Sequence, residues 1–316
     1  MLLIRGIQNI KPEHHGCVLT IGKFDGVHFG HRAVLDSLVK KARELGVPAA
    51  VMVFEPQPEE YFAPELAPAR LSTLRDKFVL LDQIGIERLI CVRFDETFSK
   101  QSPTEFVQHL LVEKLGVQFL VVGDDFKFGY KRKGDFAFLQ SSGENSGFKV
   151  VSTQSYRLDD CRISSTEIRR ALANDDFAYA KSMLGRPYAL SGKVVHGEKN
   201  GRTIGFPTAN IVIKKQKAPV SGVFAVTARI DGNRYQGVAN LGVRPTLLGQ
   251  RLQLETHIFD FSGDLYGKHM TVEFWGKLRD EMKFDSFEQL KTQIELDAKQ
   301  ARDLFQHKYN NGNQYE

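Results

Sequence analysis

Two histidines in a glycine-rich turn are the first residues of this chain whose types and spacing could do chemistry. The segment Gly22-Lys-Phe-Asp-Gly-Val-His28-Phe-Gly30-His31 follows an apolar run at 17–21 and opens a pattern of helical period. A helix start offers free backbone amides and a positive dipole end, which favour a phosphate. Imidazoles can donate to phosphoryl oxygens as charge builds, and Gly30 allows close approach of a nucleotide. We interpret the turn as a phosphate site; the alternative is two purely structural histidines.

A second hydroxyl-rich segment, Ser164-Ser165-Thr166-Glu-Ile-Arg169-Arg170, has the pattern of a helix start followed one turn later by guanidinium groups. Such a set suits the oxygens of a triphosphate, although simple helix capping explains the hydroxyls equally well when the segment is taken alone. The combination with the histidine turn favours the phosphate interpretation. The chain contains no Gly-x4-Gly-Lys-Ser/Thr motif, which excludes a P-loop site.

A third candidate lies in the second half, where a glycine-spaced loop over 197–205 precedes Phe206-Pro207-Thr208-Ala-Asn210. Thr208 and Asn210 are two residues apart, so an extended chain places both on one side. Hydroxyl and amide oxygens suit Mg²⁺, which usually keeps phosphates and waters among its ligands. The alternative is a turn between strands with incidental polar residues.

The elements that must position the first two segments alternate between strand and helix. Apolar runs at 17–21, 49–54, 89–92 and 119–122 read as strands, and helical patterns cover 32–45, 72–84 with Ser72 as cap, and 103–116. Ser102 with Glu105 forms a capping box for the last of these. This alternation predicts an α/β domain with a parallel sheet, whose ligands bind beyond the carboxyl ends of the strands.

The second half reads differently, as a mostly β domain. Period-two runs at 223–230 and 235–239 flank Asp231-Gly232-Asn233, a strong hairpin signal, and further strands are expected at 252–259 and 270–275. A long amphipathic helix begins at Ser286. We therefore expect two domains, 1–185 and 186–316, each long enough to fold by itself.

Composition excludes several classes of protein. The 316 residues are 42% hydrophobic with a net charge of +5, and no segment approaches the ~18 apolar residues of a membrane helix. Cys17, Cys91 and Cys161 lack the paired spacing of a disulfide framework or zinc site. The N-terminus makes a poor signal peptide, so we expect a cytoplasmic protein with no membrane partner. The excess of basic residues, 19 against 14 acidic ones in 186–316, is too scattered to predict nucleic-acid binding.

The motifs together resemble one family. Gly22-x-Phe-Asp-Gly-x-His-x-Gly-His31, the Ser164 segment and Gly123-Asp-Asp125-Phe126-Lys-Phe128-Gly look like the adenylyltransferase module of the bacterial bifunctional riboflavin kinases/FMN adenylyltransferases. The segments 202–210, 219–224, 240–246 and 254–260 resemble the riboflavin kinase module of the same enzymes. The resemblance covers the whole chain. It implies a Rossmann-like nucleotidyltransferase domain followed by a barrel with a long C-terminal helix.

In the N-terminal domain, the resemblance implies that FMN and ATP become FAD and pyrophosphate. His28 and His31 would then be catalytic residues. The residues expected to bind ATP are Gly22, Phe24, Asp25, Gly30, Ser164, Ser165, Thr166 and Arg169. Those expected near the flavin are Phe62, Asp125, Phe126 and Phe128, and which aromatic ring stacks on the isoalloxazine stays open. Many relatives have histidine where this chain has Gln57, so the resemblance assigns Gln57 no role.

In the C-terminal domain, the resemblance implies conversion of riboflavin and ATP to FMN and ADP, with Glu255 as the general base. Thr208 and Asn210 would hold Mg²⁺ with ATP, and Arg279 and Glu281 would lie near the flavin. The residues expected to bind ATP are Gly197, Gly201, Arg202, Gly205 and Pro207. Glu255 could instead be a cross-strand charge partner.

Two other functions were weighed against this one. A different nucleotidyltransferase fused to an unrelated β domain is disfavoured by the Pro207-Thr208-Ala-Asn210 segment. A flavin-binding regulator that has lost turnover is not excluded by sequence. The expected partners are the small molecules riboflavin, FMN and ATP, and the sequence names no protein partner.

Overall fold

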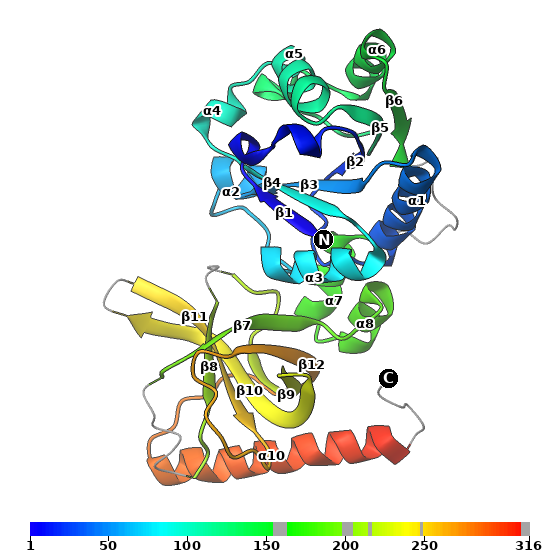
Figure 1. Cartoon of the computed structure of the whole chain (residues 1–316). Helices are drawn as coiled ribbons and strands as arrows, with labels where there is room; N and C mark the ends of the chain where they lie inside the picture. The colour runs from blue at the N-terminus through cyan, green and yellow to red at the C-terminus, as the bar shows by residue number, and fades with distance from the viewer. Residues whose placement is uncertain (154–162, 198–204, 214–216, 247–248, 311–316) are drawn as a thin grey trace. The chain divides into compact units, whose positions relative to one another are not determined.

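The computed structural model describes residues 1–153, 163–197, 205–213, 217–246 and 249–310 (Figure 1). The chain divides into two compact units. Unit 1 consists of Met1–Pro68 and Leu74–Ile163, and unit 2 consists of Ala69–Thr73 and Ser164–Glu316. Each unit is described by itself below.

Unit 1 is built on a parallel six-stranded sheet with the order β1-β4-β3-β2-β5-β6. Its strands are β1 (Leu2–Arg5), β2 (Cys17–Ile21), β3 (Ala49–Glu55), β4 (Arg88–Arg93), β5 (Val117–Val122) and β6 (Lys149–Ser152). Its helices are α1 (Phe29–Leu45), α2 (Pro58–Phe62), α3 (Leu74–Ile84), α4 (Glu96–Ser99), α5 (Pro103–Glu105) and α6 (Phe136–Ser146). Helix α5 continues as a π-helix over Phe106–Lys114. The predicted parallel α/β architecture is confirmed.

Both faces of this sheet are covered, as expected for a parallel sheet. Val18 of β2 belongs to a core with α1 and α3, whereas Cys17 and Leu19 belong to the opposite core with the π-helix and α6. Every residue of β2 is therefore buried. The strand at the centre of the sheet is fixed from both sides, which gives the turn that follows it a rigid base.

Local signals placed most helix starts correctly. The capping box is present, because the Ser102 hydroxyl accepts from the Glu105 amide at 3.2 Å. Helix α1 begins at Phe29, three residues before the expected start, because His28 caps it with its side chain. Helix α3 begins at Leu74, so Thr73 and not Ser72 directly precedes it. Cys17 and Cys91 are free and buried, and Cys161 lies outside the described residues.

Unit 2 contains a closed barrel with the strand order β10-β11-β8-β7-β12-β9, so the mostly β prediction is confirmed. The strands are β7 (Ala189–Val195), β8 (Ala209–Ile213), β9 (Gly222–Ile230), β10 (Asn233–Thr246), β11 (Gly249–Ile258) and β12 (His269–Arg279). The helices are α7 (Ser165–Ala173), α8 (Phe177–Leu184) and α10 (Phe287–Asn310). The hairpin between β9 and β10 turns at Asp231 and Gly232, which have φ of 49° and 85° as such a turn requires.

The long C-terminal helix α10 and the short helix α8 both pack on this barrel. Ala301 and Phe305 of α10 form a core with Val223, Ala225 and Val238 on β9 and β10. The Ser286 hydroxyl accepts from the Gln289 amide at 3.2 Å, as its predicted role at the helix start requires. On α8, the buried Phe177 ring meets those of Phe224 and Phe274. Helices α7 and α8 therefore fall in the compact unit of the barrel.

Candidate active sites

The first candidate site lies in the turn between β2 and α1. Phe24 and Val27 take φ of 45° and 40°, a left-handed conformation that is rare for residues with a side chain. Asp25 and His28 are 1% and 4% exposed, so the turn is anchored inward at both positions. A strained turn of this kind persists only where its surroundings determine it, and such turns are typical of binding sites.

The two histidines meet at the start of α1. Their rings stack with centroids 3.7 Å apart and planes 17° from parallel. Nδ1 of His28 accepts from the backbone N–H of His31 at 3.3 Å, which places the proton of a neutral His28 on Nε2. Nδ1 of His31 is buried and has no hydrogen-bond partner within the described residues. The structure therefore brings together both predicted catalytic histidines at a helix N-terminus.

Electrostatics keep His31 neutral. Burial lowers the pKa of His31 well below its usual value near 6.5, and the nearby charges of His28 and Lys77 lower it further. Lys77 itself is 1% exposed, on α3. A neutral imidazole can donate one hydrogen bond to a ligand oxygen, from the ring nitrogen that carries its proton.

The chain segment that leads to Ser164 passes next to this turn. A Cβ on Gly30 would lie 3.0 Å from the carbonyl oxygen of Ile163, so only glycine fits there without displacing that backbone. A Cβ on Gly22 would lie 3.1 Å from the ring of Phe24. Both glycines that the sequence analysis selected are thus sites of close approach.

The predicted triphosphate segment begins α7 in unit 2. The Ser164 hydroxyl accepts from the Glu167 amide at 3.2 Å, so the capping interpretation holds for this residue. The Arg169 side chain donates to the carbonyl of Ala69 at 2.5 Å. Thr166 is exposed and Ser165 is half-buried. These contacts leave the predicted ATP contacts of the segment as predictions.

The predicted flavin residues of unit 1 differ in their exposure. Phe128 is buried among other aromatic rings, and Phe126 stacks on it at 5.6 Å. Phe62, at the end of α2, is 67% exposed and meets the rings of Tyr61 and Phe94 edge-on. Asp125 is exposed in the loop after β5. Of these three phenylalanines, Phe62 is therefore the most exposed and Phe128 is the most deeply buried.

Gln57 precedes α2 and is 5% exposed. Its Nε2 has no hydrogen-bond partner within the described residues. A buried amide donor without a partner costs free energy, so this position favours an acceptor brought by a ligand or water. No sequence pattern indicates this role, since the only visible feature of Gln57 is its departure from the family motif.

The second candidate site lies on one face of β11. Leu252, Leu254 and Thr256 are buried, whereas Gln253 and Glu255 lie on the other, partly exposed side of the strand. In the register of the barrel, Glu255 lies opposite Asn210 of β8 on one side and opposite Asn240 of β10 on the other. Residues far apart in sequence thus form one row across three strands.

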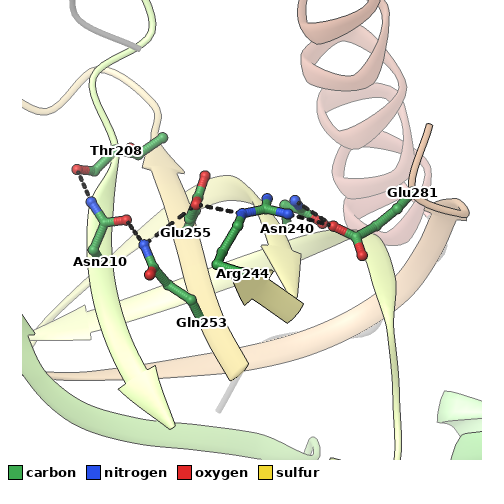
Figure 2. Close-up of polar contacts among 7 residues, drawn as sticks. All are labelled: Thr208, Asn210, Asn240, Arg244, Gln253, Glu255 and Glu281. Carbon is green, nitrogen blue, oxygen red and sulfur yellow. Dashed lines mark hydrogen bonds and ion pairs between the residues drawn. The ribbon is translucent and has the colours of Figure 1, made fainter. Parts of the chain in front are cut away.

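Hydrogen bonds connect this row (Figure 2). Oε1 of Glu255 accepts from Arg244 Nε at 3.1 Å and from Gln253 Nε2 at 3.4 Å. Gln253 Nε2 also donates to Asn210 Oδ1 at 2.7 Å, and Asn210 Nδ2 donates to the Thr208 carbonyl at 3.3 Å. The predicted base and the predicted Mg²⁺ ligands therefore belong to one polar network.

Arg244 also connects Glu255 to Glu281. Its Nη1 donates to Glu281 Oε1 at 3.1 Å, and Asn240 Nδ2 donates to the same oxygen at 3.1 Å. Burial opposes the charge of Arg244, but the carboxylates of Glu255 and Glu281 outweigh it and raise the pKa of the guanidinium. The sequence analysis assigned no role to Arg244, Asn240 or Gln253, because only the strand register brings them to Glu255.

Two glycines make room for this network. A Cβ on Gly197 would come within 2.7 Å of Asn210 Cγ and still closer to its amide nitrogen. A Cβ on Gly242 would collide with the carboxylate of Glu281. Gly205 has φ of 85°, and the carbonyl of Pro207 interacts with His257 Nδ1 at 2.9 Å. Gly201 and Arg202 lie outside the described residues.

The donor set fits magnesium brought in with a nucleotide. Thr208 and Asn210 offer neutral oxygens, and Asn210 is 6% exposed with its amide held on both sides. Within the described residues no group of three His, Cys, Asp or Glu side chains is placed to hold a metal ion. Neutral oxygens bind Mg²⁺ well only when phosphates and waters complete the shell.

Arg279 ends β12 and points its guanidinium at α10. Its Nη2 lies 2.8 Å from Asp297 Oδ2, and its Nε donates to the same carboxylate. Asp297 is 1% exposed. The contact attaches the end of β12 to the helix, and the expected flavin contact of Arg279 stays a prediction.

Comparisons with known proteins match both halves of the chain. A family model described as FAD synthetase matches residues 10–167, and one described as riboflavin kinase matches residues 184–305. None of the described helices is long and apolar enough to cross a membrane.

Similar proteins cover nearly the full length. The chain is 50% identical to a bifunctional riboflavin kinase/FMN adenylyltransferase of Pseudomonas fluorescens, over 96% of this chain and 98% of that one. It is 51% identical to a protein of the same name from Haemophilus influenzae, over 96% and 99%. A crystal structure titled macrolide-efflux protein from Streptococcus pneumoniae superposes with a TM-score of 0.74 at 30% identity, over 96% and 99%. The chain therefore belongs to the family of bifunctional riboflavin kinases/FMN adenylyltransferases.

Proposed function

We propose that this chain, a riboflavin kinase/FMN adenylyltransferase by family, makes FMN from riboflavin in residues 186–316 and FAD from FMN in residues 1–185. ATP is the co-substrate of both steps, and both require Mg²⁺. The observation that carries the proposal is that each matched family domain holds its own polar centre: the stacked histidines in one and the Glu255 network in the other. These two ranges are the domains expected from the sequence, whereas the compact units divide the chain between Ile163 and Ser164.

In the kinase step, Glu255 takes the proton of the riboflavin 5′-hydroxyl while that oxygen attacks the γ-phosphorus of ATP. The bond from this phosphorus to the bridging oxygen breaks, and ADP leaves. In the described part of the chain both hydrogen bonds to Glu255 reach Oε1, so Oε2 is the oxygen that remains to accept the proton. Arg244 orients the carboxylate before the substrate binds.

ATP is held at the kinase centre through neutral groups. Thr208 and Asn210 are the residues that would bind Mg²⁺, which there would offset the charge of the phosphates. The other residues proposed to contact ATP are Gly197, Gly201, Arg202, Gly205 and Pro207. Arg279 and Glu281 are proposed to lie near the flavin, Glu281 through the position that Gly242 leaves open.

In the adenylyl transfer, a phosphate oxygen of FMN attacks the α-phosphorus of ATP and pyrophosphate leaves. The nucleophile is already ionised, so no base is needed and catalysis is a matter of position and charge. His28 donates from Nε2, and the start of α1 adds its amides. His31 is the second proposed catalytic residue. The residues proposed to contact ATP are Gly22, Phe24, Asp25, Gly30, Ser164, Ser165, Thr166 and Arg169. Those proposed for FMN are Phe62, Asp125, Phe126 and Phe128.

The partners that we propose are riboflavin, FMN and ATP, with neither nucleic acid nor membrane, and the proposed location is the cytoplasm. The test is to incubate the purified protein with riboflavin, ATP and Mg²⁺ and to separate the flavins by chromatography over time. FMN should appear first and FAD second. Riboflavin that binds but is never converted would overturn the proposal in favour of a flavin-binding regulator.

A further inference from the structure

Three alternate residues of β11 share the face that carries the proposed base. Gln253, Glu255 and His257 all point away from the barrel interior, since Leu252, Leu254 and Thr256 between them are buried. The two residues that flank Glu255 on this face both contact residues 207–210, which comprise the start of β8 and the two residues before it. Gln253 donates to Asn210 Oδ1 at 2.7 Å, and His257 Nδ1 interacts with the carbonyl of Pro207 at 2.9 Å.

We propose that Gln253 and His257 are positioning residues that hold the segment from Pro207 to Asn210 at a fixed place relative to Glu255. The proposed base and the residues proposed to bind Mg-ATP are then in place relative to each other before the substrates bind. The inference rests on the proposed roles of Glu255, Thr208 and Asn210. It gives roles to two residues to which the sequence motifs assign none.

His257 extends the attachment beyond the backbone ladder. The pairing of β11 with β8 ends where Thr256 lies opposite Ala209, so Pro207 and Thr208 lie before the first paired residue. A carbonyl has only its acceptor to offer, so the interaction at Pro207 requires His257 to donate from Nδ1. Its ring is held edge-on by Phe206 and Phe259, with centroids 5.1 Å and 5.8 Å away. The backbone directly before Thr208 is thereby held by the His257 side chain, at a place that the pairing of β8 with β11 does not include.

Gln253 determines which side-chain atom of Asn210 faces the proposed cation. The donation from Gln253 to Oδ1 and the donation of Asn210 Nδ2 to the Thr208 carbonyl both require the same orientation of the amide. An amide oxygen has two lone pairs, so Oδ1 can accept from Gln253 and still ligate a cation. The same Gln253 Nε2 contacts Glu255, which ties the orientation of the ligand to the position of the base.

The test measures riboflavin phosphorylation against the concentration of Mg-ATP, with riboflavin binding followed separately by flavin fluorescence. Gln253→Leu and His257→Leu should each raise the half-saturating Mg-ATP concentration by about five- to twentyfold, the scale of one lost hydrogen bond with its partner left unsatisfied. Riboflavin affinity should stay within about twofold. His257→Asn should restore much of the parental value, because its amide nitrogen can replace Nδ1 as donor.

Arg251→Gln is the matched control, since Arg251 lies two residues before Gln253 on the same strand and is exposed. It should leave the Mg-ATP dependence unchanged. Riboflavin binding reports that the barrel of each variant is folded, and FAD formation from FMN reports that unit 1 is folded. In an Asn210→Ala background, Gln253→Leu should have little further effect, since its action passes through Asn210.

Two results would overturn the inference. One is a parental Mg-ATP dependence in both leucine variants, and the other is full additivity of Gln253→Leu with Asn210→Ala. The proposed function fails by a different route, namely riboflavin that binds to the parental protein but is never converted to FMN. The two failures are therefore distinguishable in one set of assays.

Discussion

The two units build their candidate sites in opposite ways. In unit 1 the histidines belong to one contiguous turn between β2 and α1, and the backbone itself supplies part of the site. In unit 2 the polar row takes Asn210 from β8, Asn240 from β10 and Glu255 from β11. In a parallel sheet the chain must cross over from the end of one strand to the start of the next. Polar residues that bind ligands therefore lie in the turns at the strand ends. An antiparallel barrel places them opposite each other on strand faces.

This difference decides how a substitution acts. A change in the turn of unit 1 acts on a helix start and on a strained backbone, so its effect stays local. A change on a barrel strand removes one member of a connected row, and the hydrogen bonds of its neighbours change with it.

The largest effect is expected for Glu255→Gln, which keeps size and hydrogen bonding but removes proton affinity. Riboflavin phosphorylation should fall by roughly 10²- to 10⁴-fold, the usual contribution of a positioned base. FAD formation from supplied FMN should be unchanged, because its nucleophile is already ionised. Single-turnover rates with bound riboflavin measure this directly. A parental rate would reduce Glu255 to the ion-pair partner of Arg244.

The stability of unit 2 should depend on α8 as much as on the barrel. Phe177 is 7% exposed and its ring centroid lies 5.7 Å from that of Phe224 and 6.5 Å from that of Phe274. Phe177→Ala should therefore lower the free energy of unfolding of unit 2 by about 3–5 kcal/mol. Urea unfolding followed by Trp275 fluorescence measures it, and Tyr179→Ala, at an exposed position of the same helix, is the control. Equal unfolding midpoints for the two variants would show that the contact of Phe177 with the barrel does not stabilise unit 2.

His28→Ala removes a preorganised donor from unit 1 and leaves the barrel untouched. FAD formation from FMN should fall by about 10²- to 10³-fold. Phosphorylation of riboflavin should continue at the parental rate. His28→Asn is a useful companion, because its side chain can still cap α1. If both variants lose FAD formation equally, the imidazole acts in chemistry; if the asparagine variant is fully active, His28 is only a cap.

The turn in unit 1 could be found from sequence because its chemistry is contiguous. Gly30 and the two histidines are neighbours in the chain, and the hairpin at Asp231 and Gly232 was equally visible as a local signal. The start of α1 was misplaced because histidine is an unusual cap, so His28 was read as a ligand only. Local rules describe local structure well, and at the start of α1 they failed because one residue serves two purposes.

The barrel site could be predicted only in part. Glu255 came from motif resemblance, and Thr208 and Asn210 came from their spacing on an extended chain, although the bounds of strand β8 were not expected. Arg244, Gln253 and His257 received no role, because nothing in a sequence states which strand lies beside which. Once the register places Glu255 opposite both Asn210 and Asn240, the alternation along β11 selects Gln253 and His257 directly.

A smaller effect is expected for Gly197→Ala. The added methyl would collide with the amide of Asn210, which must then turn away from Gln253. The half-saturating Mg-ATP concentration of the kinase should rise about tenfold, in line with ~1–3 kcal/mol for overpacking. Riboflavin affinity and FAD formation should not change. Unaltered kinase kinetics would mean that Asn210 can move without loss and is not a precise ligand.

The smallest effect concerns pH and returns to unit 1. Burial, His28 and Lys77 lower the pKa of His31 well below 6.5, so the unfolded chain binds a proton at mildly acidic pH that the folded one does not. Stability from this group is thus fully present above pH 6.5 and is lost as the pH falls below it, at up to about 1.4 kcal/mol per pH unit. His31→Gln cannot titrate, so the unfolding free energy of the variant should depend less steeply on pH between 7.5 and 5.5. The difference between the two slopes reports His31 together with its coupling to His28. Identical slopes would mean that His31 titrates alike in the folded and the unfolded chain, and the lowered pKa assigned to it would be wrong.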